Sequence, residues 1–334
     1  MFGRIIYEKY IMKKFIGIDF GTSNTFVYLN GKGIIYSEPS IIAIDKNTNA
    51  VIETGFLASK MIGRSAENVE IIHPIKRGVP ARFKPCIQLL ETALKKVKMK
   101  SLRGYQILFS IPSDITPIEK SIYVDLAKQL DANDVIFENQ AKLASLGAGV
   151  SFKENRGTMH INIGGGTSNI IVMSNDRVLV SKSSIFCGNL LDEAILRYLR
   201  KQRHLLIGNK TAEFIKMKIG SLEASPENRL LEVAGRDILT SLPHNVTIST
   251  NEVKQILLPL AELLVDAIND ALIITPPEIA SDITETGVVI SGGSSLLSGI
   301  REYIEKNINI PVRMAPDPIA GVANGMANYI KEIK

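Results

Sequence analysis

Two segments of the chain share an unusual order of apolar and polar positions. Residues 15–29 read FIGIDFGTSNTFVYL and residues 159–173 read MHINIGGGTSNIIVM, so in each segment two apolar, β-branched runs flank a glycine-containing turn. This order predicts two β-hairpins. The letters Gly-Thr-Ser-Asn occur in both, at 21–24 and at 166–169. A supersecondary unit that occurs twice suggests two related halves.

Strands and helices are predicted along the rest of the chain from the spacing of its apolar residues. Strands are predicted at 41–44, 107–111, 135–137, 178–183 and 287–290, with a turn-rich β section at 225–250. Helices are predicted at 56–69, 86–97, 117–130, 140–147, 189–203, 211–220, 252–272 (kinked at Pro259) and 296–307. Strands that mix with helices at this rhythm are typical of an α/β protein.

The tips of the two predicted hairpins favour phosphate binding. Glycines let the backbone approach a bulky anion, and the N–H groups of such a tip converge into a nest that suits a phosphate. One glycine-rich hairpin alone is more often just a turn, but two matching copies favour two phosphate loops at a shared cleft. Neither copy is a P-loop, because no Gly-Lys-Ser/Thr follows, and neither opens directly into a helix as a dinucleotide fingerprint does.

A third glycine site lies at 287–304, which reads GVVISGGSSLLSGIREYI. Glycines at a strand-to-helix junction can place a helix N-terminus beside a ligand, so this site suggests the adenosine side of a nucleotide cleft. An ordinary glycine turn is the alternative. Glu213 and Lys216 lie three residues apart on one helical face. They could together reach one ribose or base, or they could form a solvated surface pair.

Composition narrows the class of protein. The chain has 334 residues, 45% of them hydrophobic, which is enough for a sizeable core in two domains. A net charge of +5 permits an anionic ligand or membrane surface without demanding nucleic acid. Cys86 and Cys187 fit no metal spacing and the histidines are scattered, so we expect neither a zinc site nor a nucleophilic triad. Without a signal peptide or an apolar run of ~20 residues, a cytoplasmic protein is expected, with translation able to start at Met12.

In this order and spacing, the three glycine sites resemble those of the actin/sugar-kinase/heat-shock-chaperone ATPase superfamily. From residue 15 onward the chain is similar to the MreB family of bacterial actins, in stretches such as MIGRSAENV, LLIGNKTAEFIKMKIGS and GRDILTSLP that lie outside the glycine sites. The resemblance implies an α/β, two-lobed actin-like (ribonuclease-H-like) ATPase fold with four subdomains around a central nucleotide cleft. The implied subdomains are 15–37, 74–151 and 319–334 (large, lobe I), 38–73 (small, lobe I), 152–187 and 250–318 (large, lobe II) and 188–249 (small, lobe II).

The resemblance also implies a site for ATP or ADP with Mg²⁺. Asp19 matches the acidic residue near the Mg²⁺–phosphate cluster. The implied nucleotide-binding residues are Gly21, Thr22, Ser23 and Asn24 in the first phosphate loop, Gly164, Gly165, Gly166 and Thr167 in the second, Glu213 and Lys216 on the adenosine-contacting helix, and Gly292, Gly293, Ser294 and Ser295 in the adenine wall.

The residues expected to act on water depart from the family pattern. Where relatives have Glu-Glu-Pro, this chain has Asn-Gln-Ala at 139–141, and Gln140 cannot take a proton as a carboxylate would. Gln140 could still position water, as a glutamine does in small GTPases, and Asn139 could cap the helix that follows. Asn162 replaces an aspartate, which weakens the metal site, and Asn169 replaces a glutamate. These changes predict tight nucleotide binding with weak ATP hydrolysis.

A basic segment at 95–105, KKVKMKSLRGY, falls where the family often has a membrane-inserting loop. Met99 and Leu102 are flanked there by cations, which would favour anionic lipid, and a solvated basic loop is the alternative. The resemblance further implies a homopolymer of paired filaments, peripheral to the inner face of the cell membrane, that could work with sibling filament proteins.

Three functions fit this superfamily, because a fold does not decide a function. The leading interpretation is a cytoskeletal filament protein whose assembly follows its nucleotide, with a role in cell shape or membrane-associated scaffolding. A small-metabolite kinase would need a carboxylate base beside the γ-phosphate, where Asp19 is the only obvious acid. A heat-shock chaperone would need a further peptide-binding domain, which is not expected because the chain ends at Lys334. The matching stretches outside the glycine sites favour the filament protein.

Overall fold

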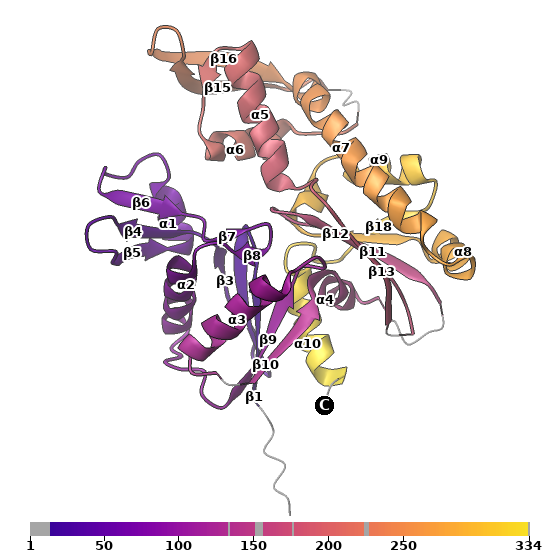
Figure 1. Ribbon diagram of the computed structural model, residues 1–334. Coiled ribbons are helices and arrows are strands. Elements are labelled where there is room, and N and C mark those ends of the chain that lie inside the picture. Colours follow the sequence, from indigo (N-terminus) through magenta and orange to yellow (C-terminus); the bar gives the residue numbers. More distant parts are fainter. Residues whose placement is uncertain (1–13, 133, 151–155, 176, 224–226, 333–334) are drawn as a thin grey trace, which may run out of the picture.

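Two bodies lie side by side in the computed structural model, each built around a five-stranded sheet (Figure 1). We call the body with the N-terminal hairpin lobe I, and the body with the second hairpin lobe II. The structure describes residues 14–132, 134–150, 156–175, 177–223 and 227–332. The mixed α/β character predicted from the sequence is confirmed. The predictions about residues 1–12 lie outside the described residues, and the exact subdomain boundaries stay predictions.

The sheet of lobe I has the strand order β10-β9-β1-β2-β3. Its strands are β1 (Lys14–Phe20), β2 (Asn24–Leu29), β3 (Gly33–Pro39), β9 (Tyr105–Ile111) and β10 (Asp134–Asn139). β1 pairs antiparallel with β2, which confirms the first predicted hairpin, and parallel with β9. The helices α2 (Phe83–Lys96) and α3 (Pro117–Gln129) pack apolar side chains against one face of this sheet.

The sheet of lobe II repeats this arrangement in the order β13-β12-β11-β17-β18. Its strands are β11 (Thr158–Ile163), β12 (Ser168–Ser174), β13 (Arg177–Ser184), β17 (Val288–Ser291) and β18 (Val312–Met314). β11 pairs antiparallel with β12 and parallel with β17, so the second hairpin is confirmed and occupies the place that β1 and β2 have in lobe I. The helices that pack on one face are α7 (Thr250–Ile273), α8 (Pro277–Thr286) and α9 (Ile300–Ile308), while α5 (Gly188–Gln202) and α6 (Asn209–Ile219) extend the same core towards the smaller sheet of this lobe.

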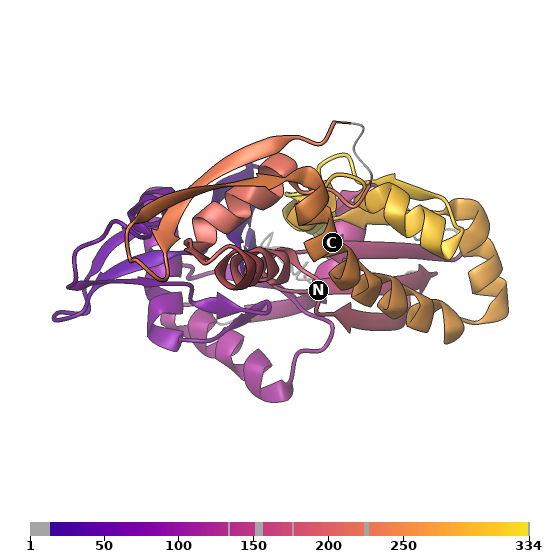
Figure 2. The same cartoon turned by 90° about the horizontal axis from the view of Figure 1, so that it is seen from above.

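Smaller sheets extend each lobe. Lobe I carries β4 (Ile42–Asp45), β5 (Val51–Thr54) and β6 (Val69–Ile72) with α1 (Gly55–Met61), and the two-stranded pair β7 (Ile75–Lys76) and β8 (Val79–Pro80). Lobe II carries β14 (Leu205–Leu206), β15 (Leu230–Asp237) and β16 (Pro243–Ser249). In Figures 1 and 2, both three-stranded sheets lie on the same side of the molecule, away from α8 and α9.

Two helices lie between the two large sheets and join the lobes. These helices are α4 (Gln140–Gly147) and α10 (Gly321–Glu332). Side chains of both pack against the lobe I sheet, and α4 also packs against the lobe II sheet. The helices cross so closely that a Cβ added to Gly325 would lie 1.7 Å from the Leu143 carbonyl oxygen, and one added to Gly147 would lie 1.9 Å from that of Gly321. Backbone therefore meets backbone at this crossing, which fixes the floor between the hairpins.

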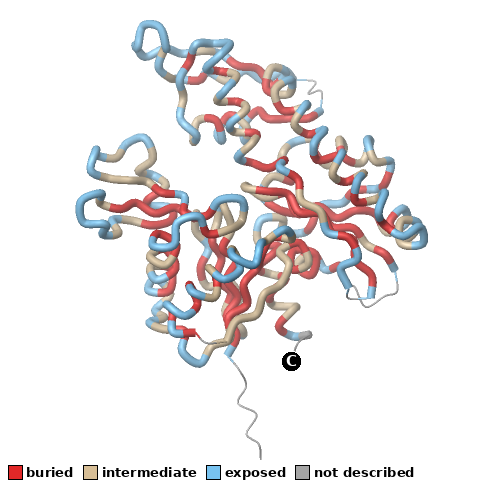
Figure 3. The backbone as a smooth tube through the Cα atoms, viewed as in Figure 1, coloured by how far each residue is buried: buried red, intermediate tan, exposed pale blue. Residues whose placement is uncertain are grey.

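Burial follows the strands, as the colouring of Figure 3 shows. Ile16, Ile18 and Phe20 of β1 are buried against α2 and α3, while Phe15 and Tyr28 face α4 and α10. Both faces of these strands are thus covered, which explains their almost uninterrupted apolar runs. Within the described ranges, none of the helices has both the length and the apolar character needed to cross a bilayer.

Several element predictions need correction. The helix predicted at 56–69 ends at Met61, since glycine and polar residues follow it. The helix predicted at 296–307 is a 3₁₀ turn, η1 (Gly293–Leu296), followed by α9. The helix α8 was not predicted; it begins at Pro277, because proline is favourable in the first turn of a helix. Pro259 lies inside the helix α7, and the kink expected there stays a prediction.

Candidate functional site

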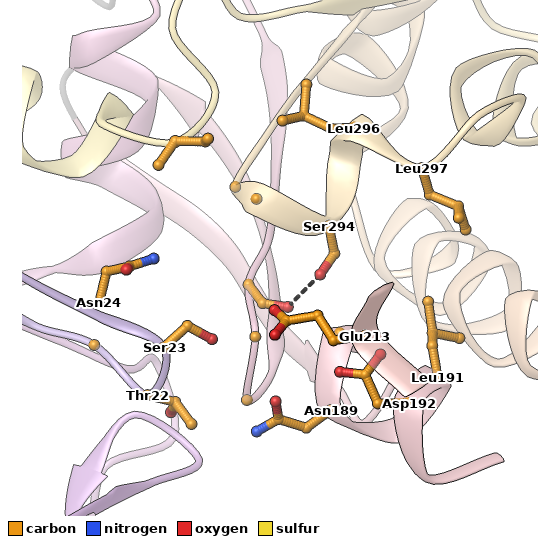
Figure 4. A pocket seen from close by; sticks show the side chains of 18 of the residues that line it. Thr22, Ser23, Asn24, Asn189, Leu191, Asp192, Glu213, Ser294, Leu296 and Leu297 are labelled. Carbon is orange, nitrogen blue, oxygen red and sulfur yellow. Dashed lines mark hydrogen bonds between the residues drawn. The ribbon is translucent and has the colours of Figure 1, made fainter. Parts of the chain in front are cut away.

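A cavity of about 530 Å³ lies between the two hairpin tips (Figure 4). It is lined by both lobes, and it collects residues that are far apart in the sequence. The predicted site residues among its lining are Asp19, Gly21, Thr22, Ser23, Asn24, Gln140, Asn162, Gly164, Gly165, Gly166, Thr167, Glu213, Lys216, Gly292, Gly293 and Ser294. The three glycine sites therefore surround one space.

The two hairpins correspond to each other in a register that differs from the one given by their shared letters Gly-Thr-Ser-Asn. The Gly21 N–H donates to the carbonyl of Asn24 (3.1 Å) in the first tip, and the Gly164 N–H donates to the carbonyl of Thr167 (3.0 Å) in the second. Gly21 therefore corresponds to Gly164, so the letters Gly-Thr-Ser-Asn that the two tips share lie two residues out of structural register. In the correct register, the position of Asp19 in lobe I is that of Asn162 in lobe II.

In the first tip, Ser40 holds the carbonyl groups away from the cavity. Its hydroxyl donates to the Gly21 carbonyl (2.6 Å) and its N–H donates to the Ser23 carbonyl (2.9 Å). The N–H groups of Thr22 and Ser23 make no hydrogen bond within the described part of the chain. They are therefore available to an anion in the cavity.

The second tip is held in the same way by different elements. The carbonyl of Gly164 accepts from the N–H of Gly188 (3.1 Å) and from the hydroxyl of Ser294 (2.9 Å), the bond drawn in Figure 4. The carbonyl of Gly165 accepts from the N–H of Asn189 (2.9 Å), at the start of α5. Each lobe thus turns a glycine tip so that its donors, rather than its acceptors, remain for a phosphate.

Asp19 is the buried carboxylate of the site. Ser110 on the neighbouring strand β9 donates to its Oδ1 (2.5 Å), and the Gln140 amide donates to the same oxygen (3.2 Å). Burial raises the pKa of Asp19, and these two hydrogen bonds lower it in part. A cation in the cavity would stabilise the ionised form.

Asn162 has the equivalent position in lobe II and an equivalent partner. Ser291 on the neighbouring strand β17 donates to its Oδ1 (3.1 Å), and the Ser291 hydroxyl also meets Nε2 of His160 (2.8 Å). Burial lowers the pKa of His160 to about 3, with a smaller contribution from the charge of Arg313. His160 is therefore neutral at physiological pH. Because Oδ1 of Asn162 already accepts a hydrogen bond, its amide group can offer a donor to the cavity.

The side chains of the cavity suit a Mg²⁺ ion on the lobe I side only. Magnesium is commonly held by one or two carboxylates together with phosphate oxygens and water. Asp19 can accept hydrogen bonds from metal-bound water through Oδ2, since Ser110 and Gln140 both donate to Oδ1. Asn162 supplies an amide instead of a charge, and the described residues contain no cluster of three or more histidine, cysteine or acidic side chains that could hold a metal. Mg²⁺ would therefore rely on the nucleotide's own phosphates and on Asp19, where it would neutralise phosphate charge.

The wall opposite the hairpins comes from α5, α6 and η1. Glu213 projects from α6 into the cavity (Figure 4). Lys216 lines the cavity with Glu213, so their shared contact with one ribose or base stays a prediction; its Nζ pairs with Asp192 of α5 (2.8 Å) and donates to the Gly188 carbonyl (3.1 Å). This lysine therefore fixes α5 against α6 and places Asp192 at the cavity, where burial raises the pKa of that carboxyl.

Some predicted site residues lie elsewhere. Asn139 does not line the cavity, because its carboxamide oxygen caps α4 by accepting from Ala141 (2.8 Å) and Lys142 (3.3 Å). The cap was the alternative for this residue, and it is confirmed. Ser295 is fully buried, and its hydroxyl donates to the Gly292 carbonyl (2.7 Å), so it shapes the wall without forming its surface.

The proposed lipid contact at Leu102 is contradicted by the structure. Leu102 is fully buried in the lobe I core, and Met99 is partly buried against the same core. The apolar members of this segment fill space beneath the end of α2, while its lysines remain outside. An apolar residue between cations cannot be assigned to membrane or core by sequence alone.

Sequence reasoning missed several residues of the cavity. They are Phe26, Gly78, Gly188, Asn189, Leu191, Asp192, Met217, Lys218, Gly220, Arg229, Leu296, Leu297, Ser298, Ile319 and Val322. The N-terminus of α5 had a detectable signal, because glycine and asparagine begin an amphipathic helix there. Ser110 and Ser291 carried none, since a lone serine at a strand end is common.

Comparison with known proteins places the chain in a family. The model of the MreB/Mbl protein family matches residues 13–334. The chain belongs to the MreB/Mbl family. It is 36% identical over 319 residues to the cell shape-determining protein Mbl of Bacillus cereus, covering 95% of this chain and 96% of the relative. It is 36% identical over 336 residues to the cell shape-determining protein MreB of Escherichia coli, covering 97% of each.

Solved structures show the same fold. MreB5 of Spiroplasma citri bound to AMPPNP superposes with a TM-score of 0.92 at 34% identity, over 96% of this chain and 97% of that one. A structure of MreB5 bound to ADP matches equally well. A protomer of the MamK double helical filament has a TM-score of 0.82 at 18% identity, over 96% of this chain and 99% of that one. This MreB/Mbl family member therefore has the actin-like fold.

Proposed function

We propose that this MreB/Mbl family member is an ATP-binding cytoskeletal protein that polymerises into filaments under the control of its nucleotide. The observation that carries the proposal is the pair of glycine tips whose free N–H groups face one cavity. ATP and ADP as ligands are supported by MreB5, which was crystallised with AMPPNP and with ADP. A role in cell shape is supported by the names of the curated relatives.

The residues near the phosphates support slow hydrolysis. Asp19 is a carboxylate of the site, and its Oδ1 already accepts hydrogen bonds from a serine and from Gln140. Gln140 lines the cavity as an amide, so it can orient water but cannot remove its proton. The proposed cycle is therefore tight binding of ATP with Mg²⁺, assembly, and slow release of phosphate.

One paired experiment tests this function. The protein is incubated with ATP, ADP or AMPPNP, and polymer sedimentation and phosphate release are measured on the same sample. Polymer with ATP and AMPPNP, accompanied by little phosphate, is the expected result. Formation of ADP without polymer that increases when small metabolites are added, with the phosphoryl group transferred to the metabolite, would support the alternative, a small-metabolite kinase.

The partners proposed are further copies of this chain in paired filaments, sibling filament proteins and an anionic membrane surface. The basic segment at 95–105 supports the membrane contact through charge alone, since Leu102 is buried and Lys96 already pairs with Glu38 (2.7 Å). Each exposed cation near an anionic bilayer adds about 1 kcal/mol.

The membrane contact is tested by the double charge reversal Lys98→Glu/Lys100→Glu. Co-sedimentation with vesicles that contain phosphatidylglycerol should fall at least tenfold, with no change for neutral vesicles. Vesicle binding that the reversal leaves intact would rule the segment out as the contact.

A further inference from the structure

A line of side-chain hydrogen bonds passes from lobe II to lobe I beside the cavity. The Ser183 hydroxyl of β13 donates to Oδ1 of Asn169 (3.2 Å), and Nδ2 of Asn169 donates to Oε1 of Gln140 (3.4 Å). Nε2 of Gln140 then donates to Oδ1 of Asp19 (3.2 Å). Asn169 lies on β12 and Gln140 begins α4, so the amide–amide bond joins the two lobes.

The donor and acceptor ends of this line are set by its chemistry. An ionised carboxylate only accepts hydrogen bonds, so the amide end that faces Asp19 must be the N–H₂ group of Gln140. The carbonyl end of Gln140 then points to Asn169, which must present its own N–H₂ group. Oδ1 of Asn169 accepts a hydrogen bond from the hydroxyl of Ser183, which lies directly opposite it on the neighbouring strand. Every amide in the line therefore has one satisfied orientation.

Burial of Asn169 fixes the orientation of this line of hydrogen bonds at its lobe II end. Asn169 is fully buried and does not line the cavity, so its N–H₂ group has no water to replace Gln140 as a partner. Gln140 is half-buried and does line the cavity. The carbonyl oxygen of Gln140 is thus drawn towards the interior of lobe II, while its N–H₂ group lies beside Asp19.

The carbonyl oxygen is the part of a glutamine that can accept a hydrogen from an attacking water. In ATP hydrolysis the water oxygen bonds to the γ-phosphorus, the bond from that phosphorus to the β–γ bridging oxygen breaks, and ADP leaves. One water proton passes to the phosphate product or to solvent, so Gln140 gains and loses no atom. Its contribution depends only on where it holds the water.

We propose that Asn169 is a positioning residue that keeps the Gln140 carbonyl oxygen away from the attacking water and so slows hydrolysis. The inference rests on the proposed function, since it assumes that ATP binds in this cavity. It assigns the slow step to the orientation of Gln140 as well as to its lack of a carboxylate. The lobe II strand β12 thereby controls a group of lobe I.

The test is the kinetics of phosphate release by Asn169→Leu, which keeps the side-chain size and removes the donor. Loss of one neutral hydrogen bond corresponds to about a fivefold change, so kcat should rise about fivefold. The KM for ATP should stay unchanged, because Asn169 does not line the cavity. Ser181→Ala is the matched control, since this exposed serine lies on the same strand as Ser183 and makes no contact with the line.

The positioning role is separated from a structural one by the background of Gln140→Ala. There, Asn169→Leu should no longer change kcat, and a change that persists would overturn the proposal, as would an unchanged or lowered kcat in the single variant. If Asn169→Leu does not fold, Ser183→Ala replaces it and should raise kcat about twofold, with no rise counting against the proposal. Binding of a fluorescent ADP is measured for every variant: wild-type protein that binds none defeats the proposed function, whereas normal binding with unresponsive kcat defeats only the role of Asn169.

Discussion

The first hairpin of lobe I and its counterpart in lobe II have the same backbone and different chemistry. In both, a glycine N–H closes the tip and the tip carbonyls are held back by other segments. In both, a serine of the adjacent parallel strand donates to the residue before the tip. That residue is Asp19 in lobe I and Asn162 in lobe II. Both lobes therefore carry a backbone loop that can bind phosphate, whereas only lobe I carries a carboxylate at this position.

The difference teaches that phosphate binding and catalysis depend on separate features of this fold. Binding uses backbone N–H groups, which both hairpins supply whatever their side chains are. Metal positioning and water activation use carboxylates, and those can be replaced by amides without loss of the hairpin. Asn162 keeps the hydrogen bond to Ser291 that an aspartate would make, so its substitution leaves the fold intact.

The largest effect is expected where both hairpins depend on one support, the crossing of α4 and α10. Gly325→Ala would place a Cβ 1.7 Å from the Leu143 carbonyl oxygen, so the helices must separate. Overpacking of this kind should lower the free energy of unfolding by about 3 kcal/mol. Nucleotide binding should weaken at both hairpins together. Thermal unfolding measures the change in stability, and binding of fluorescent ADP measures the change in nucleotide affinity. Gly208→Ala is the control, since nothing lies within 4 Å of that Cβ; an equal effect of the two substitutions would contradict the shared support.

Substitutions that exchange the side chains of Asp19 and Asn162 should have effects of intermediate size on stability and on Mg²⁺ dependence, with opposite signs. Asn162→Asp buries a second carboxylate, which should destabilise the nucleotide-free protein by about 1–3 kcal/mol and make ADP binding more dependent on Mg²⁺. Asp19→Asn removes the carboxylate whose pKa burial raises, so it should stabilise the nucleotide-free protein and reduce the effect of Mg²⁺. Urea unfolding and ADP titrations with and without EDTA check both. Equal responses of the two variants to Mg²⁺ would remove the asymmetry between the lobes.

The effect that is smallest at neutral pH concerns His160, which stands where lobe I has Gly17. Its ordinary pKa is 6.5 and burial lowers it to about 3, so the unfolded chain takes up the proton first as the pH falls. The stability that this group contributes is complete above pH 6.5 and is lost towards pH 3. The free energy of unfolding should fall by up to about 1.4 kcal/mol per pH unit in that window. Urea unfolding at pH 7, 6 and 5 should show a smaller slope for His160→Gln; identical slopes would mean that His160 does not titrate in this way.

The sequence revealed the hairpins because glycine tips between apolar runs depend on local geometry. Their register could not be read from letters, since the second tip has three glycines and the shared Gly-Thr-Ser-Asn falls two places later. The helix α10 was missed because its small residues serve a contact with α4 that is distant in sequence. Neither alternative for Leu102, lipid contact or a solvated loop, placed it in the core, because burial under α2 depends on the tertiary fold. Local chemistry was predictable, and long-range packing was not.

The close crossing of α4 and α10 has a mechanical consequence. A contact made by side chains can be relieved by a change of rotamer, but carbonyl oxygens set against glycines leave no such freedom. The two helices can tilt about their contact more easily than they can slide along it. We therefore expect any widening of the cavity to be a rotation of the two rigid lobes about this point, so that both glycine tips release a bound phosphate chain in one movement.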